Sequence, residues 1–376
     1  MPTWEELRRL ASFRFDGSRA ISLYVNLDPS ESPTAGDVQT RLNGLLGEAE
    51  RLIERERVAL THQEWEGLRR DLARIARWFE KEFDRAGVRG VAVFAAGDGE
   101  LFRTLELPEP VADDVRVEPE LHLAPLARFA ERDGALVAVV GRERGQVYRL
   151  DANALVPIAD ESSDTPRRHD QGGLSQANYE RHIETIVDRH LRDVAATLER
   201  CVRRTGGREV VLVGTEATRA EFEALLPNEV KNCIVGRTSA EAHADASALL
   251  GVVRPVLDRL RANEERELLE RWRGEAGRSG RAATGWEQTL EAASDGRVEL
   301  LLVQAGHDRA AYCCPKCGRA QLTDGSCPLD GTTLERRDDG LDLAVHQTLS
   351  HGGTVRVVHE LRDLEPVGGV GALLRY

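Results

Sequence analysis

The sequence predicts an α/β fold arranged in three domains. Short apolar runs of the kind found in buried strands alternate along the chain with long charged segments whose apolar residues recur at helical spacing. A chain of 376 residues is long enough for two or three domains, and a composition that is 41% hydrophobic and 31% charged is globular. We expect domains at residues 1–120, 121–250 and 251–376.

The elements of the first two domains follow from residue type and periodicity. The first domain is expected to contain a strand, two helices and a strand pair, at residues 20–27, 42–60, 63–86, 90–94 and 100–107. The second is expected to contain a helix, a strand pair, a polar loop with a long helix, a strand, a helix and a strand, at residues 125–132, 135–140, 146–150, 167–205, 210–214, 218–226 and 233–235.

A very long charged helix leads into the third domain. It is expected over residues 240–274 and ends in a Gly-rich break. A helix at residues 282–293 and a strand at residues 298–303 follow. The chain closes on residues 367–376, where a Gly-rich turn precedes an apolar strand and lets it turn tightly into a sheet.

A polar loop and the helix after it organise the middle domain. The loop begins with Arg167 and Arg168 and ends with Gly172 and Gly173, which lack Cβ atoms and let the backbone approach another molecule closely. We expect Ser175 to be the N-cap of the helix, which carries an apolar stripe on one face. A Gly-rich loop on a packed helix suits insertion into a cavity lined by nucleic acid.

The loop and its helix are a basic island on an acidic chain. A net charge of -13 argues against a general nucleic-acid coat protein. From residue 167 to residue 208, however, nine Arg stand against six Asp and Glu. The candidate RNA-binding residues are Arg167, Arg168, Arg181 and Arg189. The alternative is that the helix arginines form i,i+4 pairs on a solvated face, as the spacing of Asp188–Arg192 and Glu199–Arg203 allows.

Cysteines near the end of the chain are spaced as metal ligands. Two residues separate Cys314 from Cys317 and a glycine follows, so both thiolates can reach one ion. A second such turn begins at Cys327 and has Asp330 at the position of a fourth cysteine, and zinc accepts carboxylate oxygen. Four ligands with no open position would hold structural zinc in a knuckle at residues 313–331.

Other ligand choices stay open at the knuckle. Cys313 could replace Asp330, although its adjacency to Cys314 strains that geometry. His307 and His346 fit surface or packing positions better than ligand positions, and the knuckle could also be held by packing without metal. Four of the six cysteines cluster here, which indicates metal binding in a reducing cytoplasm and not a disulfide framework.

Several kinds of segment are not found in the sequence. No basic-then-apolar signal segment opens the chain, and no run of about 18 apolar residues occurs, so no membrane partner is expected. The residues after the strand at 210–214 lack the Gly-Lys-Ser/Thr end of a phosphate-binding loop. A translational GTPase that assists this protein would therefore be a separate chain.

The loop and the chain end resemble the archaeo-eukaryotic class I release factor and Pelota superfamily. Its release factors carry Gly-Gly-Gln and then Ser-Ala-aromatic-Arg at the start of a long helix. Here Gly172-Gly173 is followed by Leu174-Ser175-Gln176 and then by Ala177 to Arg181, so Leu174 and Ser175 are inserted. Bacterial branches and the related mitochondrial ribosome quality-control hydrolases tolerate such variants. The resemblance extends to residues 367–376 and to the order of elements.

The resemblance implies a three-domain release-factor/Pelota-like architecture with the zinc knuckle inserted in the C-terminal α/β domain. It also implies a cytoplasmic factor that binds rRNA in the ribosomal A site and hydrolyses peptidyl-tRNA on stalled ribosomes. Gly172 and Gly173 would let the loop enter the peptidyl-transferase centre, and Gln176 would position water or stabilise the oxyanion. Stop-codon reading is not expected, because the chain has no Asn-Ile-Lys-Ser tetrapeptide.

Two alternatives to hydrolysis stay open. The first is a non-catalytic hibernation or stalled-ribosome factor that fills the A site, which the insertion before Gln176 also fits. The second is a nuclease acting on RNA, but no acidic pair or His pair of the required kind stands near the loop.

Overall fold

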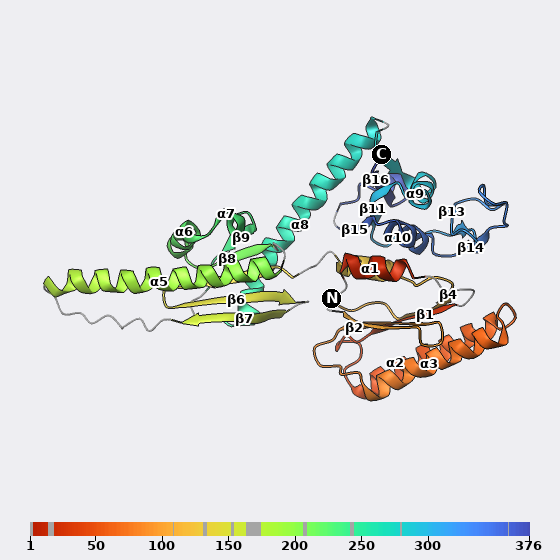
Figure 1. Cartoon of the computed structure of the whole chain (residues 1–376), viewed down its shortest axis with the longest axis horizontal. Coiled ribbons are helices and arrows are strands. Elements are labelled where there is room, and N and C mark those ends of the chain that lie inside the picture. The colour runs from red at the N-terminus through yellow and green to blue at the C-terminus, as the bar shows by residue number, and fades with distance from the viewer. Residues whose placement is uncertain are drawn as a thin grey trace. The chain divides into compact units, whose positions relative to one another are not determined.

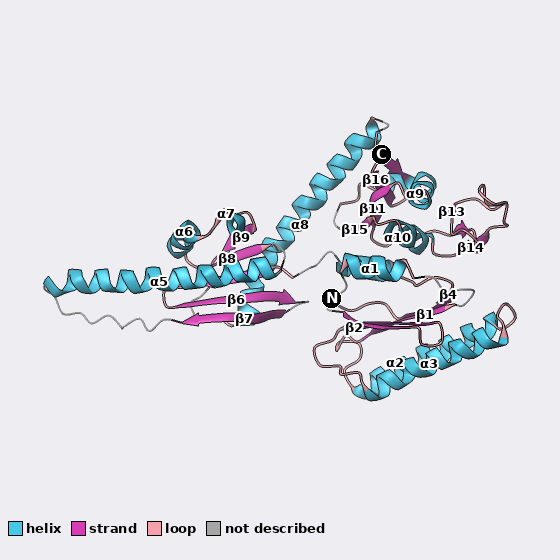
Figure 2. Ribbon diagram, in the orientation of Figure 1, coloured by secondary structure: helices cyan, strands magenta, loops and turns pink. Residues whose placement is uncertain are grey.

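The computed structural model describes most of the chain, as residues 3–13, 19–107, 109–130, 134–151, 154–162, 174–205, 209–240, 244–278, 280–359 and 361–376. At residues 130, 151, 162 and 174–183 it describes the backbone but not the side chains. The fold is mixed α/β (Figures 1 and 2). None of the described helices combines the length and the apolar composition needed to cross a membrane.

The chain divides into two compact units. Residues Met1–Glu131 and Glu265–Tyr376 form the first, which we call the split unit, and Arg132–Glu264 form the second, the inserted unit. Each of the three stretches of chain contains its own main sheet. The boundaries at residues 120 and 250 remain predictions.

The N-terminal part of the split unit is built on a four-stranded antiparallel sheet of order β3-β2-β1-β4. Its strands are β1 (Ala20–Asn26), β2 (Gly90–Ala96), β3 (Leu101–Leu107) and β4 (Asp114–Glu118). Every residue of β1 and β2 is buried, because both faces of the sheet are covered. The first three strands were predicted from the sequence, whereas β4 was not.

Two long helices cover one face of this sheet: α2 (Ala35–Glu56) and α3 (His62–Lys81). Each begins with a capping box, in which Thr34 or Thr61 exchanges hydrogen bonds with an acidic residue three positions on. Helix α2 begins seven residues before the predicted position. The prediction started at the first buried apolar residue, Leu42, whereas the Thr34 cap begins the helix at Ala35. The prediction of two consecutive helices is confirmed.

The other face of the sheet packs on the C-terminal part of the chain. One continuous core joins residues of β1 and β2, helices α1 (Trp4–Ala11) and α4 (Ala124–Ala130), and the C-terminal elements. The C-terminal sheet has the order β10-β16-β11-β15, with β11 and β15 parallel. Its elements are β10 (Ala282–Thr284), α9 (Gly285–Ser294), β11 (Val298–Gln304), α10 (Gly340–Ser350), β15 (Thr354–Val358), the 3-10 turn η1 (Glu365–Val367) and β16 (Val370–Leu374).

The predicted helix at residues 282–293 is wrong at its start, where β10 pairs with β16 and α9 begins only at Gly285. The Gly-rich chain end is as predicted: Gly368 and Gly369 both have φ of +82°, in the left-handed region that favours glycine. Gly371 is equally constrained, because a Cβ there would lie 2.8 Å from the Trp272 ring.

The inserted unit is a five-stranded mixed sheet of order β7-β6-β5-β8-β9. Its elements are β5 (Leu136–Val140), β6 (Arg144–Asp151), β7 (Ala154–Ser162), α5 (Leu174–Arg204), β8 (Val210–Val213), α6 (Glu216–Leu225), α7 (Asn228–Lys231) and β9 (Ile234–Thr238). Helices α5 to α7 pack on one face, and the first turns of α8 (Ala246–Gly277) pack on the other. The parallel strands β5 and β8 are the buried apolar runs that were predicted.

Candidate functional site

Helix α5 is fixed firmly to the inserted unit. Its stripe of Val187, Leu191, Val194, Leu198 and Val202 is buried against the sheet. The strand β6 approaches it so closely that a Cβ on Gly145 would lie 2.3 Å from Val194 Cγ2. The helix is therefore packed on the sheet from Val187 to Val202.

The predicted catalytic residues lie at the start of this helix. Gln176 lies in the first turn of α5, which begins at Leu174, so Ser175 is inside the helix and the prediction that it is the N-cap is not retained. Gly172 and Gly173 precede the helix and lie outside the described residues, and the side chain of Gln176 is also not described.

The predicted RNA-binding residues fall into two groups. Arg167 and Arg168 lie outside the described residues, and only the backbone of Arg181 is described. Arg189 is exposed on α5.

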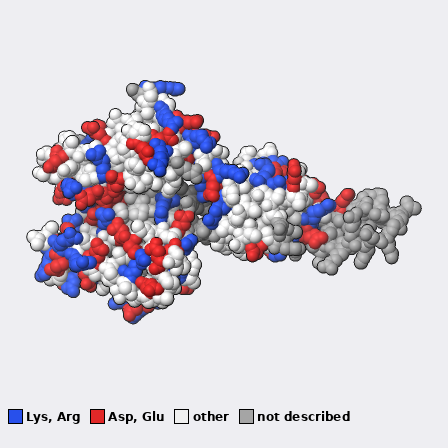
Figure 3. All heavy atoms as spheres, turned by 180° about the vertical axis from the view of Figure 1, so that it is seen from behind, with Lys and Arg blue, Asp and Glu red and all other residues white. Residues whose placement is uncertain are grey.

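Further along α5 the i,i+4 pairs are present. Arg192 and Asp188 are 2.9 Å apart and Arg203 and Glu199 are 2.7 Å apart, between nitrogen and carboxylate oxygen. Exposed pairs of this kind contribute little to stability, so they do not prevent these arginines from binding phosphate instead. Figure 3 shows basic and acidic side chains interspersed over the described part of the face in view.

The cysteine turns near the chain end fold as two equivalent loops. Gly318 N–H donates to the Cys314 carbonyl and Gly331 N–H to the Cys327 carbonyl, both at 2.9 Å. Gly318 has a φ of +77° and Gly331 a φ of +74°, which explains a glycine at the same position of each turn. The loops are held on a small sheet of β12 (Ala311–Cys313), β13 (Ala320–Gln321) and β14 (Glu335–Arg337).

These loops bring together the four predicted metal ligands. The ligand atoms of Cys314, Cys317, Cys327 and Asp330 all lie within 4.8 Å of one another. Cys317 Sγ is 3.5 Å from Cys327 Sγ, far beyond a disulfide bond, and Cys314 Sγ is 3.7 Å from Asp330 Oδ2. Three thiols and a carboxylate around one point can bind a metal ion, in a closed set typical of structural sites.

Cys313, the alternative fourth ligand, faces elsewhere. Its side chain is buried, its Sγ lies 3.4 Å from the Gly318 carbonyl, and burial raises the pKa of the thiol to about 12. Asp330 instead accepts a hydrogen bond from Thr332 N–H at 3.0 Å, which holds the pKa of its carboxyl below the ordinary value. His346 is buried in α10, and neither it nor His307 joins the ligand group.

The knuckle is tied to the helices of the C-terminal sheet. The Gln347 side chain on α10 donates to the Gly318 carbonyl at 2.7 Å, and Arg319 pairs with Asp295 at 2.6 Å. Unfolding of the metal loops should therefore disturb the packing of α9 and α10.

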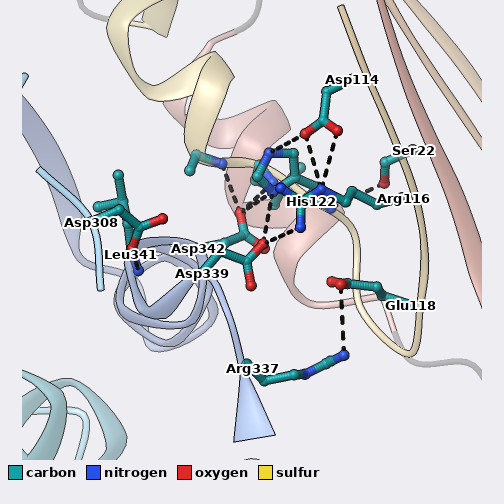
Figure 4. Close-up of polar contacts among 12 residues, drawn as sticks. Ser22, Asp114, Arg116, Glu118, His122, Asp308, Arg337, Asp339, Leu341 and Asp342 are labelled. Carbon is teal, nitrogen blue, oxygen red and sulfur yellow. Dashed lines mark hydrogen bonds and ion pairs between the residues drawn. The ribbon is translucent and has the colours of Figure 1, made fainter. Parts of the chain in front are cut away.

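A second group of ligand-type residues was missed from the sequence. His122, Asp339 and Asp342 are buried together in the split unit (Figure 4). Their sequence positions carry no signal of this, because His122 and the two carboxylates are separated by the whole inserted unit.

The chain is similar in sequence to archaeal peptide chain release factors over nearly its whole length. It is 24% identical to peptide chain release factor subunit 1 of Archaeoglobus fulgidus over 400 aligned positions, covering 99% of this chain and 96% of that protein. It is 25% identical to the Thermoplasma acidophilum protein of the same name, covering 73% and 72%. Among solved structures, a model of ribosome-bound archaeal Pelota is 16% identical, covers 76% of this chain and 77% of that chain, and has a TM-score of 0.41.

A model of a bacterial family matches the middle of the chain. Residues 122–265 match the model of bacterial archaeo-eukaryotic release factor family 10. The matched segment is nearly the inserted unit, Arg132–Glu264, which contains α5 and the loop before it.

Proposed function

We propose that this protein is a ribosome-associated rescue factor that promotes hydrolysis of peptidyl-tRNA on stalled ribosomes without reading a stop codon. One observation carries the proposal: the segment that matches the release factor family contains Gly172-Gly173 and Gln176 at the head of its long packed helix. The finer architecture that we infer is that of release factors and Pelota, in three domains, with the knuckle inserted in the last.

The chemistry is attack of water on the ester that joins the peptide to tRNA. Gly172 and Gly173 allow the backbone to pass close to the end of the P-site tRNA. The Gln176 amide positions the water or donates to the oxyanion, a role in which one donor is typically worth about 10²–10³-fold in rate. The ribosome and the tRNA hydroxyl groups supply the rest of the site, so the protein needs no general base of its own.

The partners follow from the same residues. Arg167, Arg168, Arg181 and Arg189 contact rRNA phosphates in the A site. A translational GTPase is a separate protein, because the sequence after β8 has no phosphate loop and the Thr215 hydroxyl there is engaged in capping α6. Zinc held by Cys314, Cys317, Cys327 and Asp330 is structural, and the protein acts in the cytoplasm.

Release of labelled peptide from purified stalled ribosome complexes tests the proposal. The wild-type protein should release peptide well above the buffer control. A protein that co-sediments with these ribosomes but releases no more peptide than buffer would contradict hydrolysis.

One observation favours a second function, that of a non-catalytic hibernation or stalled-ribosome factor in the A site. Leu174 and Ser175 separate the glycine pair from Gln176, and α5 already begins at Leu174. Gln176 therefore belongs to a helical turn and not to the loop itself, so it would have to act from the helix end. The release assay separates the two functions directly.

Charge reversal at the start of the loop should weaken ribosome binding. Replacing Arg167 and Arg168 by Glu removes two phosphate contacts, so the affinity should fall and its dependence on salt should become less steep. A charge-matched control replaces Arg336 and Arg362, two exposed residues of the split unit, by Glu. Co-sedimentation with ribosomes at several salt concentrations measures the effect, and equal behaviour of the two double variants would contradict this role.

A further inference from the structure

A buried charged group lies where the two parts of the split unit meet. His122 lies in the turn before α4, and Asp114 and Arg116 lie on β4, all in the N-terminal part. Asp339 and Asp342 lie at the start of α10 in the C-terminal part. Figure 4 shows these side chains converging from the two parts of the chain.

His122 is fixed on every side. Its ring Nε2 lies 3.4 Å from Asp114 Oδ2, and its Nδ1 lies 3.1 Å from Asp342 Oδ1, in an ion pair by distance and not a well-aligned hydrogen bond. Its backbone N–H donates to Ser22 Oγ at 3.0 Å, and its carbonyl accepts from the Tyr24 hydroxyl. The ring therefore faces carboxylates of both parts while the backbone is held to β1.

The Asp342 side chain also binds backbone amides of the N-terminal part. Its Oδ1 accepts hydrogen bonds from Leu123 N–H at 2.8 Å and from Ala124 N–H at 2.9 Å. A side chain of α10 thus satisfies amides at the start of α4 that would otherwise be without partners.

Arg116 makes a second bridge between the parts. Its guanidinium lies 3.0 Å from Asp339 Oδ2 and also 3.0 Å from Asp114 Oδ2. At the edge of the group, Arg337 of β14 lies 3.8 Å from Glu118 of β4.

The charges of the group depend on one another. Burial lowers the pKa of His122, but the Asp342 and Asp114 carboxylates outweigh this effect and raise it to about 9. Burial likewise acts to raise the pKa of Asp342, yet the His122 charge and the backbone hydrogen bonds keep it below the ordinary value. A buried carboxylate with such partners is costly once one partner is removed.

An ion-pair group fits these residues better than a metal site. Ligand atoms of His122, Asp339 and Asp342 lie within 4.8 Å of one another, as they would around a cation. The Asp339 carboxylate, however, is already paired with the Arg116 guanidinium. Asp342 Oδ1 already accepts hydrogen bonds from two backbone N–H groups and lies against the imidazole of His122. A cation between these ligands would face a fixed positive charge.

We propose that His122, Asp114, Arg116, Asp339 and Asp342 form a charge lock that joins the N-terminal and C-terminal parts of the split unit into one cooperatively folded body. The inserted unit is covalently joined to this body at both ends, near residues 131 and 265. Opening the lock would leave the two chain ends of the inserted unit on separately moving parts. The proposal is independent of the proposed function.

The stability contributed by His122 should depend on pH in a defined direction. A histidine whose pKa is raised on folding contributes its full stability below the unfolded value of 6.5, and this contribution is lost as the pH rises through about 9. The groups whose charges act at the lock are Tyr24 on β1, Asp114, Arg116 and Glu118 on β4, Asp308 after β11, Arg337 on β14, and Asp339, Asp342 and His346 at α10.

The test is unfolding of the full chain by denaturant at several pH values, with wild type and the His122→Gln variant compared. All five tryptophans lie in the split unit, so their fluorescence reports on this body alone. At pH 6.5 the variant should increase the unfolding equilibrium constant on the order of 10²-fold, and the difference from wild type should shrink between pH 6.5 and 9.5. The control His190→Gln alters a buried histidine of the inserted unit, whose pKa burial lowers, and should keep the wild-type pH profile over this range.

Hydrogen exchange tests whether the group joins the two parts. Amides of β4 and of α10 should become exposed together in the His122→Gln variant, at a pH where wild type protects both. If that variant does not fold, Asp339→Asn should give the same paired exposure to a smaller extent, because it removes the Arg116 bridge and the longer contact with His122 but leaves Asp342 in place. Three results would contradict the charge lock. The two parts of the wild-type split unit could unfold in separate transitions, or His122→Gln could leave the dependence of stability on pH unchanged. The third is that Mn²⁺ stabilises the wild type and that His122→Gln abolishes this stabilisation.

Discussion

Replacing Cys314 by Ser is expected to remove stoichiometric zinc from the protein and to unfold the knuckle. Metal binding and folding share one free energy in such sites, about 10–16 kcal/mol in isolated zinc-finger peptides, and part of it should appear here as lost stability. The loss should reach α9 and α10, because Gln347 and Arg319 tie them to the loop that carries Cys317. Elemental analysis and the midpoint of thermal unfolding measure the two effects.

The neighbouring thiol provides a matched control. Cys313→Ser makes the same chemical change one residue away, at a buried side chain that faces the Gly318 carbonyl and not the ligand group. It should keep the metal, whereas Asp330→Ala should weaken its binding. Absence of zinc from the wild-type protein, or loss of zinc from Cys313→Ser but not from Cys314→Ser, would contradict the site.

Replacing Gln176 by Ala is expected to reduce peptide release by about 10²–10³-fold, the usual effect of removing one oxyanion-type donor. Binding to the ribosome should be nearly unchanged, since a single exposed side chain contributes little to a large interface. Gly173→Val should act similarly through the backbone, because a β-branched residue cannot readily adopt the conformations open to glycine.

Gln171 provides the control for this experiment, because it is a glutamine of the same segment on the other side of the glycine pair. Gln171→Ala should release peptide at close to the wild-type rate. Full activity of Gln176→Ala would contradict the role of Gln176 while leaving hydrolysis in place. If neither variant changes release because wild type has none, the hibernation function takes its place.

The parts of the fold that were predictable are those with a clear period. Strands β1, β5 and β8 are apolar runs, and α2, α3 and α5 bury a single stripe. Helix α10 was missed because all of its residues from Leu343 to Leu349 are buried, which removes the alternation of apolar and polar faces. Strand β10 is only three residues long, too short to show a periodic pattern, and it is recognised as a strand by its pairing with β16.

The candidate sites differ in the same way. The knuckle ligands lie in one short segment, so their spacing alone predicts that they meet. The charge lock depends on β4 packing near the start of α10, and neither element was predicted. A histidine at residue 122 and carboxylates at 339 and 342 carry no sign of one another until the sheets are assembled.

We propose that the segment before α5 acts on peptidyl-tRNA, and a structure of the protein on a stalled ribosome with peptidyl-tRNA in the P site tests this role. We predict that residues 172–176 lie at the acceptor end of that tRNA, with Arg167 and Arg168 against rRNA phosphates. A protein bound in the A site with this segment directed away from the tRNA end would contradict the claim.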